Sequence, residues 1–182
     1  MAKTGRTTLM MASMPLDHGK AKPSMRIGVT GHQKIPAQGL EYVTQGASLV
    51  LDQVKGELVG VSSLAAGGDQ LFASLVLERG GRLEVVLPCS LYENTFSDQE
   101  DLRNFHTLLQ RASSVETLNF VEPSNEAYLA AGHRVVDLSE LILAIWDGQP
   151  AKGKGGTADI VDYARKRRTR LEIVWPEGMV RP

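Results

Sequence analysis

Short apolar runs alternate with amphipathic segments along most of the chain. Runs rich in Val, Ile and Leu that stop at Gly, Ser, Pro or Asp are typical of β-strands, whereas apolar positions that recur every three or four residues are typical of helices. This pattern predicts strands at 26–31, 57–63, 82–88, 114–120, 140–148 and 171–175. It predicts helices at 39–55, 69–79, 97–112, 125–137 and 155–167.

Strands that alternate with helices at this spacing indicate an α/β protein. The run 140–148 is almost continuously apolar, which is typical of a central parallel strand that is buried on both faces. We therefore predict a Rossmann-like three-layer α/β/α fold with a mostly parallel sheet. Right-handed crossovers place the carboxyl ends of all the strands along one edge of such a sheet, where ligands bind.

The first part of the chain lacks this pattern. Residues 1–24 are polar and small, and their single apolar run, LMMASM, is too weak for the apolar region of a signal peptide. We expect a disordered tail at 1–24, or an overlong start, because Met25 directly precedes the first strand. A single folded domain is expected at 25–178.

Composition narrows the function classes. The 182 residues are 42% hydrophobic and 23% charged, which is typical of a globular protein. The net charge is -1, from 20 basic and 21 acidic side chains, and this disfavours nucleic-acid binding through overall charge. No apolar run approaches the roughly 20 residues that span a bilayer. With one cysteine, Cys89, no internal disulfide can form, and we expect a cytoplasmic protein with no membrane contact.

The 18 glycines are the unusual feature of the composition, and several follow predicted strands in three short turns. Glycines just before a helix let a phosphate approach free backbone amides at the positive end of the helix dipole. The turns therefore predict binding of a nucleotide or a nucleotide-derived ligand. The candidate binding residues are Gly31, His32, Ser63, Gly67, Gly68, Asp69, Asp147, Lys154, Gly155, Gly156 and Thr157.

Each of these turns also has a purely structural interpretation. Residues 153–156 could form a flexible loop with Thr157 as the helix cap, and Asp69 could cap its own helix. No Gly-Lys-Ser or Gly-Lys-Thr tripeptide is present and no GxGxxG, so a P-loop and a standard nicotinamide site are disfavoured. No His or Cys pair has metal-ligand spacing, and we expect neither a metal nor another cofactor.

Other side chains leave their roles open. Tyr92, Phe96 and Tyr128 could stack on a base or cover the sheet edge as ordinary packing. Cys89 is expected to be a small buried thiol. Ser97 and Glu100 have the spacing of a capping box. The basic run 165–170, RKRRTR, is favoured as a solvated helix end over a nucleic-acid patch.

Together, the segments IGVTGHQ, SSLAAGGDQLFA, LPCSLYENTF and AGHRVVDLSELILAIWDGQPAKGKGGTADIVDYA resemble the SLOG superfamily. This superfamily groups Rossmann-like proteins akin to DNA-processing protein A and the lonely-guy phosphoribohydrolases. The resemblance covers residues 26–175. It implies a nucleotide site at the strand ends and self-association into a homo-oligomer.

The resemblance leaves three functions to compare. The first is a binding module, such as a sensor, for a nucleoside phosphate or an ADP-ribose-like ligand. The second is a hydrolase that cleaves the N-glycosidic bond of a nucleoside monophosphate, with Asp159 or Asp147 as the catalytic residue that assists the water or the oxocarbenium-like ribosyl centre. The third is a nucleic-acid-binding protein. The loop Gly153-Lys154-Gly155-Gly156-Thr157 lacks the Pro-Gly-Gly start of the lonely-guy signature, so binding is favoured and catalysis stays undecided.

Overall fold

The computed structural model describes residues 23–151 and 155–181. The expected tail, apart from its last two residues, and the candidate Lys154 lie outside these ranges. The strands are β1 (Ser24–Gly31), β2 (Glu57–Ser62), β3 (Arg82–Leu87), β4 (Ser114–Thr117), β5 (Leu141–Ile145) and β6 (Arg170–Ile173). The helices are α1 (Ala37–Asp52), α2 (Gly68–Glu78), the 3-10 turn η1 (Tyr92–Thr95), α3 (Gln99–Gln110), α4 (Asn125–Asp137) and α5 (Thr157–Arg167).

The strands form one sheet in the order β4-β3-β2-β1-β5-β6, and every neighbouring pair is parallel. The first three crossovers move outward from β1 to β4, and the next returns across the sheet to β5 on the other side of β1. The winding direction therefore reverses between β1 and β5. Ligands of open parallel sheets bind at such a reversal, outside the carboxyl ends of the strands.

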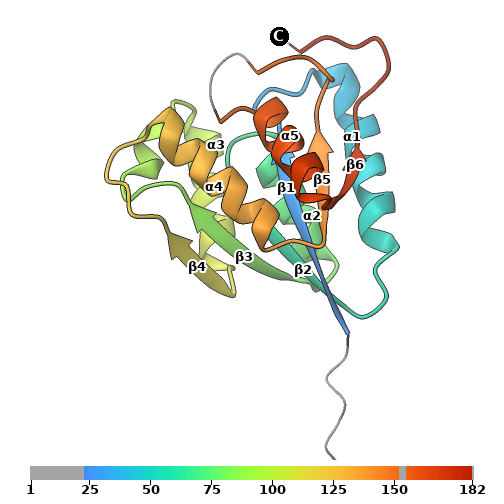
Figure 1. The fold of residues 1–182 in the computed structure, drawn as a ribbon, viewed down its shortest axis with the longest axis horizontal. Helices are drawn as coiled ribbons and strands as arrows, with labels where there is room; N and C mark the ends of the chain where they lie inside the picture. The colour runs from blue at the N-terminus through green and yellow to red at the C-terminus, as the bar shows by residue number, and fades with distance from the viewer. Residues whose placement is uncertain (1–22, 152–154, 182) are drawn as a thin grey trace, which may run out of the picture.

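Helices cover both faces of the sheet, which confirms the predicted three-layer fold. Figure 1 shows α4 and α5 in front of the sheet and α2 behind it. On the α1 and α2 side, Ile27, Val29 and Phe72 belong to one buried cluster. On the α4 and α5 side, Val135 and Ile142 belong to another. The helices thus bury both faces of the central strands, as parallel sheets require.

The most apolar segment behaves as predicted. All five residues of β5 are buried, and the strand lies between β1 and β6. The strand is shorter than the predicted 140–148, because Trp146 and Asp147 leave the sheet at its carboxyl end. By contrast, all four residues of β4 are exposed at the edge of the sheet. Because β5 ends at Ile145, the residues that follow it are not paired in the sheet, and their side chains can contribute to a binding site.

Three predicted helix caps are wrong, and at α5 the cap residue is Gly156 rather than Thr157. Asp98, not Ser97, caps α3, and its carboxylate accepts hydrogen bonds from the amides of Glu100 and Asp101. A carboxylate one residue closer to the helix satisfies the free amides and complements the dipole. At α2 the cap residue is Gly67, and Asp69 lies inside the first turn. Among the described residues, no helix is long and apolar enough to cross a membrane.

Candidate functional site

A cavity of about 740 Å³ opens at the carboxyl ends of the central strands. All three glycine-rich or polar turns contribute to its wall, together with η1, α3, α4 and the carboxyl-terminal segment. Of the expected binding residues within the described ranges, seven line the cavity: Gly31, His32, Ser63, Asp69, Gly155, Gly156 and Thr157. The topology thus brings together turns that are far apart in the sequence.

The beginning of α5 forms one side of this cavity. Gly155 has a positive φ of 81°, Gly156 is the cap residue, and the buried Thr157 is the first helical residue. The Asp159 carboxylate accepts a 2.9 Å hydrogen bond from the Gly155 amide and so holds the loop against the helix. The first amides of an α-helix have no intrahelical acceptor. This side of the cavity therefore offers hydrogen-bond donors and a positive dipole to an anion.

The glycines of the second turn have a different task. A Cβ on Gly68 would lie 3.0 Å from the Cα of Gly31, and one on Gly67 would collide with the carbonyl oxygen of Gln33. The Gly68 amide donates a 3.0 Å hydrogen bond to the carbonyl of His32. Gly67 and Gly68 therefore let α2 pack backbone to backbone against the end of β1. Neither of these two glycines lines the cavity.

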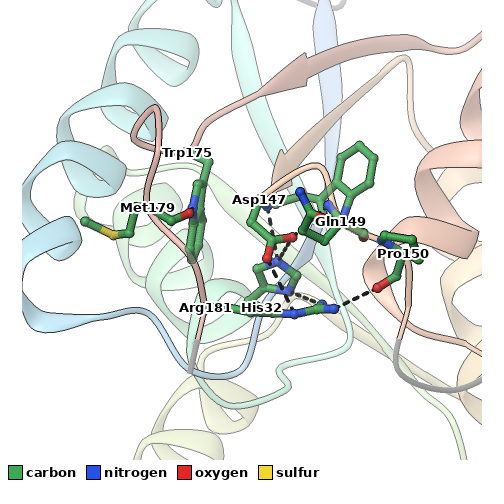
Figure 2. Close-up of polar contacts among 8 residues, drawn as sticks. His32, Asp147, Gln149, Pro150, Trp175, Met179 and Arg181 are labelled. Carbon is green, nitrogen blue, oxygen red and sulfur yellow. Dashed lines mark hydrogen bonds and ion pairs between the residues drawn. The ribbon is translucent and has the colours of Figure 1, made fainter.

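At the reversal point, His32 and Asp147 meet from the ends of β1 and β5. The two atoms His32 Nε2 and Asp147 Oδ1 are 2.8 Å apart, and both side chains are buried. Arg181 approaches from the carboxyl-terminal segment, with its Nε 3.5 Å from Asp147 Oδ2. Figure 2 shows Arg181 extending alongside His32 toward Pro150, whose carbonyl accepts a 2.7 Å hydrogen bond from Nη2. Two central strands and the end of the chain thus share one polar cluster.

The electrostatics of Asp147 favour the ionised carboxylate. Burial acts to raise its pKa, but three influences outweigh burial and leave the pKa below its usual value. These are the hydrogen bond from the Gln149 amide, the hydrogen bond and charge of His32, and the charge of Arg181. Asp147 therefore stays negative over the physiological pH range and balances the charge of Arg181 beside it.

Asp69 has the opposite electrostatics in the cavity wall. The residue is 6% exposed, and its Oδ2 lies 3.3 Å from both the Ser62 hydroxyl and the Ser63 amide that donate to it. Burial raises its pKa to about 7, and the hydrogen bonds from Ser63, Ser62 and Ala65 offset only part of that effect. Near neutral pH the carboxyl group can therefore both release and accept a proton.

Aromatic side chains surround the region next to Asp69. Tyr92 packs edge-on against Phe96, Phe105 and Tyr128, with ring centroids 5.6 to 6.3 Å apart. Three of these rings line the cavity and also pack in the core cluster beneath it: Tyr92, Phe96 and Tyr128. Burial, together with the negative charge of Asp69, raises the pKa of Tyr92, so its phenol stays neutral. The same three rings therefore pack in the core and also present surface to the cavity.

The two acids expected to be catalytic do not face the cavity. Asp159 lies in the first turn of α5 and is bonded to the loop amide, and Asp147 is covered by His32 and Arg181. Neither belongs to the cavity wall. Sequence reasoning missed Arg181 and Lys34, which both line it. Lys34 follows His32 and Gln33 directly and could have been noticed, but no local pattern pointed to Arg181.

The remaining candidates have structural surroundings. Cys89 is buried in the core cluster beneath the aromatic rings, as expected. In the basic run, Arg165 lies over the Trp146 ring and 3.4 Å from Asp162, and Arg167 pairs with Asp137. These contacts fit a helix end with complementary charge. Within residues 23–151 and 155–181, no group of three or more His, Cys, Asp or Glu is placed to hold a metal ion.

Solved structures with the same fold supply the comparison with known proteins. The chain is similar to DNA processing protein A from Streptococcus pneumoniae, at 18% identity over 82% of this chain and 50% of that chain, with a TM-score of 0.59. It is also similar to DNA processing protein A from Helicobacter pylori, at 18% identity over 86% of this chain and 67% of that chain, with a TM-score of 0.62. That protein binds single-stranded DNA.

A third similar structure is the structural-genomics target TM1055, at 12% identity over 81% of this chain and 72% of that chain, with a TM-score of 0.53. The chain spans about half the length of the Streptococcus pneumoniae protein. No family model matches the chain, and no curated protein matches its sequence. At these identities the likeness establishes the Rossmann-like fold alone.

Proposed function

We propose that the cavity binds a nucleotide or a nucleotide-derived ligand. The observation that carries this proposal is the cavity's position at the reversal point, with the start of α5 on one side and aromatic rings on another. Its volume of about 740 Å³ falls within the roughly 300–1,000 Å³ of ligand pockets. The cavity is therefore large enough for a base, a ribose and one or more phosphates.

The phosphate end of the ligand belongs beside α5. The amides at the helix start, the Thr157 hydroxyl, and the cations Arg181 and Lys34 all belong to this cavity wall. A helix amino end combines free N–H donors with a positive dipole, which favours a phosphate. Arg and Lys add charge that the rest of the wall, with Asp69 and Asp101, does not supply.

The base end belongs beside the aromatic rings. Tyr92, Phe96 and Tyr128 present apolar surface to the same cavity, and aromatic side chains stack on bases of any kind. The partly exposed Phe96 and Tyr128 have surface to offer, whereas Tyr92 is largely covered. Polar atoms of Ser63 and Asp69 lie in the same wall and can bond to the edge of a base.

Isothermal titration calorimetry on the full chain tests this proposal. We expect AMP or ADP-ribose to bind, and we expect Gly156→Val to weaken that binding at least tenfold, because the added side chain occupies the phosphate side. The backbone of Gly156, with φ of -76°, accepts any residue. Ala37→Val on the exposed start of α1 is the matched control. Absence of binding by both ligands to the folded wild type would contradict the proposal.

Asp69 favours a second function, hydrolysis of the N-glycosidic bond of a nucleoside monophosphate. A carboxyl group with a pKa of about 7 in the cavity wall is suited to proton transfer at neutral pH. In this reaction the water oxygen bonds to C1′ of the ribose while the bond from C1′ to the base nitrogen breaks. Asp69 gives its proton to the departing base and its carboxylate takes a proton from the water.

Release of free base from AMP, followed by chromatography, tests the hydrolase function. We expect Asp69→Asn to lower the rate about 100-fold, the usual contribution of one acid or base. Asp162→Asn, at an exposed position of α5, is the comparison variant and should retain most of the activity. Equal rates in Asp69→Asn and the wild type would remove Asp69 from the reaction.

A further inference from the structure

The carboxyl-terminal segment after β6 folds back onto the site. The Trp175 ring packs edge-on against His32, with centroids 5.1 Å apart, and its Nε1 donates a 2.8 Å hydrogen bond to the carbonyl of Met179. The Met179 amide donates to the carbonyl of Pro176, closing a turn in which Gly178 has a φ of 74°. This turn fixes the direction of the chain that carries Arg181 (Figure 2).

The guanidinium of Arg181 has one short contact and two long ones among the described residues. Its one short contact among the described residues is the 2.7 Å hydrogen bond from Nη2 to Pro150. The distances from Nε to Asp147 Oδ2 and from Nη1 to His32 Nδ1 are both 3.5 Å, which is long for a hydrogen bond. A guanidinium carries five N–H donors. Several donors are therefore not used in short contacts within the described part of the chain.

Asp147 shows the same incomplete arrangement from the other side. Its side chain is 1% exposed, and Oδ2 has no hydrogen-bond partner within the part of the chain that the structure describes. A buried carboxylate is costly unless a cation and hydrogen bonds compensate it. Here the compensation comes from His32 on Oδ1 and from the charge of Arg181 near Oδ2. Asp147 and His32 therefore attract the Arg181 guanidinium without making short hydrogen bonds to its N–H groups.

The side chain of Arg181 nevertheless reaches the cavity. It is 16% exposed, and it lines the same cavity as Thr157 at the start of α5. We propose that the carboxyl-terminal segment delivers Arg181 to the cavity as the residue that binds the anionic group of the ligand, an inference that rests on the proposed nucleotide-binding function. A guanidinium fork binds two phosphate oxygens at once, which neither Lys34 nor a helix amide can do alone. The ligand class is therefore a phosphorylated nucleotide derivative rather than a nucleoside.

Comparing a phosphorylated ligand with its uncharged counterpart tests the role of Arg181. Calorimetry on the full chain measures AMP, ADP-ribose and adenosine against the wild type, Arg181→Ala and Arg181→Lys. We expect Arg181→Ala to weaken AMP and ADP-ribose at least tenfold and to leave adenosine within twofold. Arg181→Lys should fall between, because it keeps the charge and loses the fork. Lys166→Ala, an exposed charge in the last turn of α5, is the matched control.

The outcomes separate this inference from the function on which it rests. If neither AMP nor ADP-ribose binds the folded wild type, both proposals are wrong. If they bind the wild type and Arg181→Ala binds them within twofold, or more tightly, only the role of Arg181 is wrong. A parallel loss of adenosine in Arg181→Ala also overturns that role, because it would mean that Arg181 shapes the cavity rather than binding the anion. Circular dichroism confirms that each variant is folded.

Discussion

Asp147 and Asp69 are both buried acids at the carboxyl edge of the sheet, yet their pKa values move in opposite directions. Burial acts to raise both. Asp147 accepts from the Gln149 amide, has the ring of His32 at 2.8 Å and has the charge of Arg181 nearby, and its pKa is lowered. Asp69 has only a hydroxyl and backbone amides as donors, and its pKa rises to about 7.

The difference shows that the pKa of each carboxyl group depends on how far burial is offset. At Asp69 burial outweighs the hydrogen bonds, whereas at Asp147 the Gln149 amide, His32 and Arg181 together outweigh burial. At neutral pH Asp147 is a fixed negative charge that faces the Arg181 guanidinium at the reversal point. Asp69 is poised between its two protonation states in the cavity wall. An aspartate therefore supplies a fixed negative charge at position 147 and a group that can exchange a proton at position 69.

Removing the carboxylate of Asp147 should have the largest effect on stability. Asp147→Ala removes the buried carboxylate that both the His32 ring and the Arg181 guanidinium face, and we expect it to lower the free energy of unfolding by about 3 kcal/mol. Chemical denaturation at pH 7 measures this. Asp162→Ala, in which an exposed pair with Arg165 is lost, is the control and should change stability by less than about 0.5 kcal/mol. An equal, small effect of both variants would contradict the anchoring role of Asp147.

The titration of Asp69 should appear as a pH-dependent stability. Because its pKa is higher in the folded protein than the ordinary value of 3.8, the folded state binds more protons between about pH 4 and 7. Its contribution therefore favours folding below that range and is lost as the pH rises through 7. Relative to Asp69→Asn, we expect the wild type to lose about 2 kcal/mol between pH 5 and pH 8. Denaturation of both proteins at the two pH values measures this.

The Asn variant keeps an oxygen that can accept from the Ser63 amide, so it is a close structural match. Other titratable groups near the cavity include Tyr92, Asp101, Cys89, His32 and Lys34, and the Asn variant leaves all of them in place. Parallel pH profiles of the wild type and Asp69→Asn would show that Asp69 does not titrate in this range.

A substitution at Thr157 tests the phosphate side of the cavity without changing Asp69 or Asp147. Thr157→Val removes one hydroxyl from the cavity wall with almost no change in shape. We expect AMP to bind about tenfold more weakly, which corresponds to about 1.4 kcal/mol for the loss of a hydrogen bond to a charged group. Calorimetry measures this, with the exposed Thr107→Val on α3 as the control. Unchanged affinity would place the phosphate elsewhere.

The smallest effect should come from the hydroxyl beside Asp69. The Ser62 hydroxyl donates to the ionised carboxylate and so lowers the pKa of Asp69. Ser62→Ala should raise the titration midpoint by about half a pKa unit, or about 0.7 kcal/mol. Carboxyl-carbon NMR on labelled protein measures the midpoint directly. A fall in the midpoint would have the wrong sign for this explanation.

Local patterns were sufficient to predict the helices, the strands and the edge where the turns meet. β5 and α4 could be predicted well because their apolar periodicity is contained within a few residues. Local patterns were not sufficient to predict the role of the glycine turns. Gly67 and Gly68 resemble a phosphate loop in sequence, but they serve the close approach of α2 to β1. Both uses require a residue without a side chain, so the sequence does not distinguish them.

The polar cluster could not be predicted for a different reason. His32 and Asp147 were recognised separately, but their contact depends on β1 and β5 being neighbours, which is a property of the topology. Arg181 lies after the last strand and beyond residue 178, where the expected domain ends, and its place depends on the turn built by Trp175 and Met179. Similarly, the pKa of Asp69 reflects burial that only the packed structure creates.

The most direct test of ligand binding at this cavity is a two-dimensional amide NMR titration of the isotope-labelled full chain with AMP. We expect saturable shifts of the amide signals of Gly31, Gly156 and Thr157, and of the Arg181 side-chain signal, because these groups line one cavity. The amide signals of the exposed edge strand β4 should stay in place. Shifts confined to β4 or to the basic end of α5, or no shifts at millimolar AMP, would contradict a nucleotide site at the strand ends.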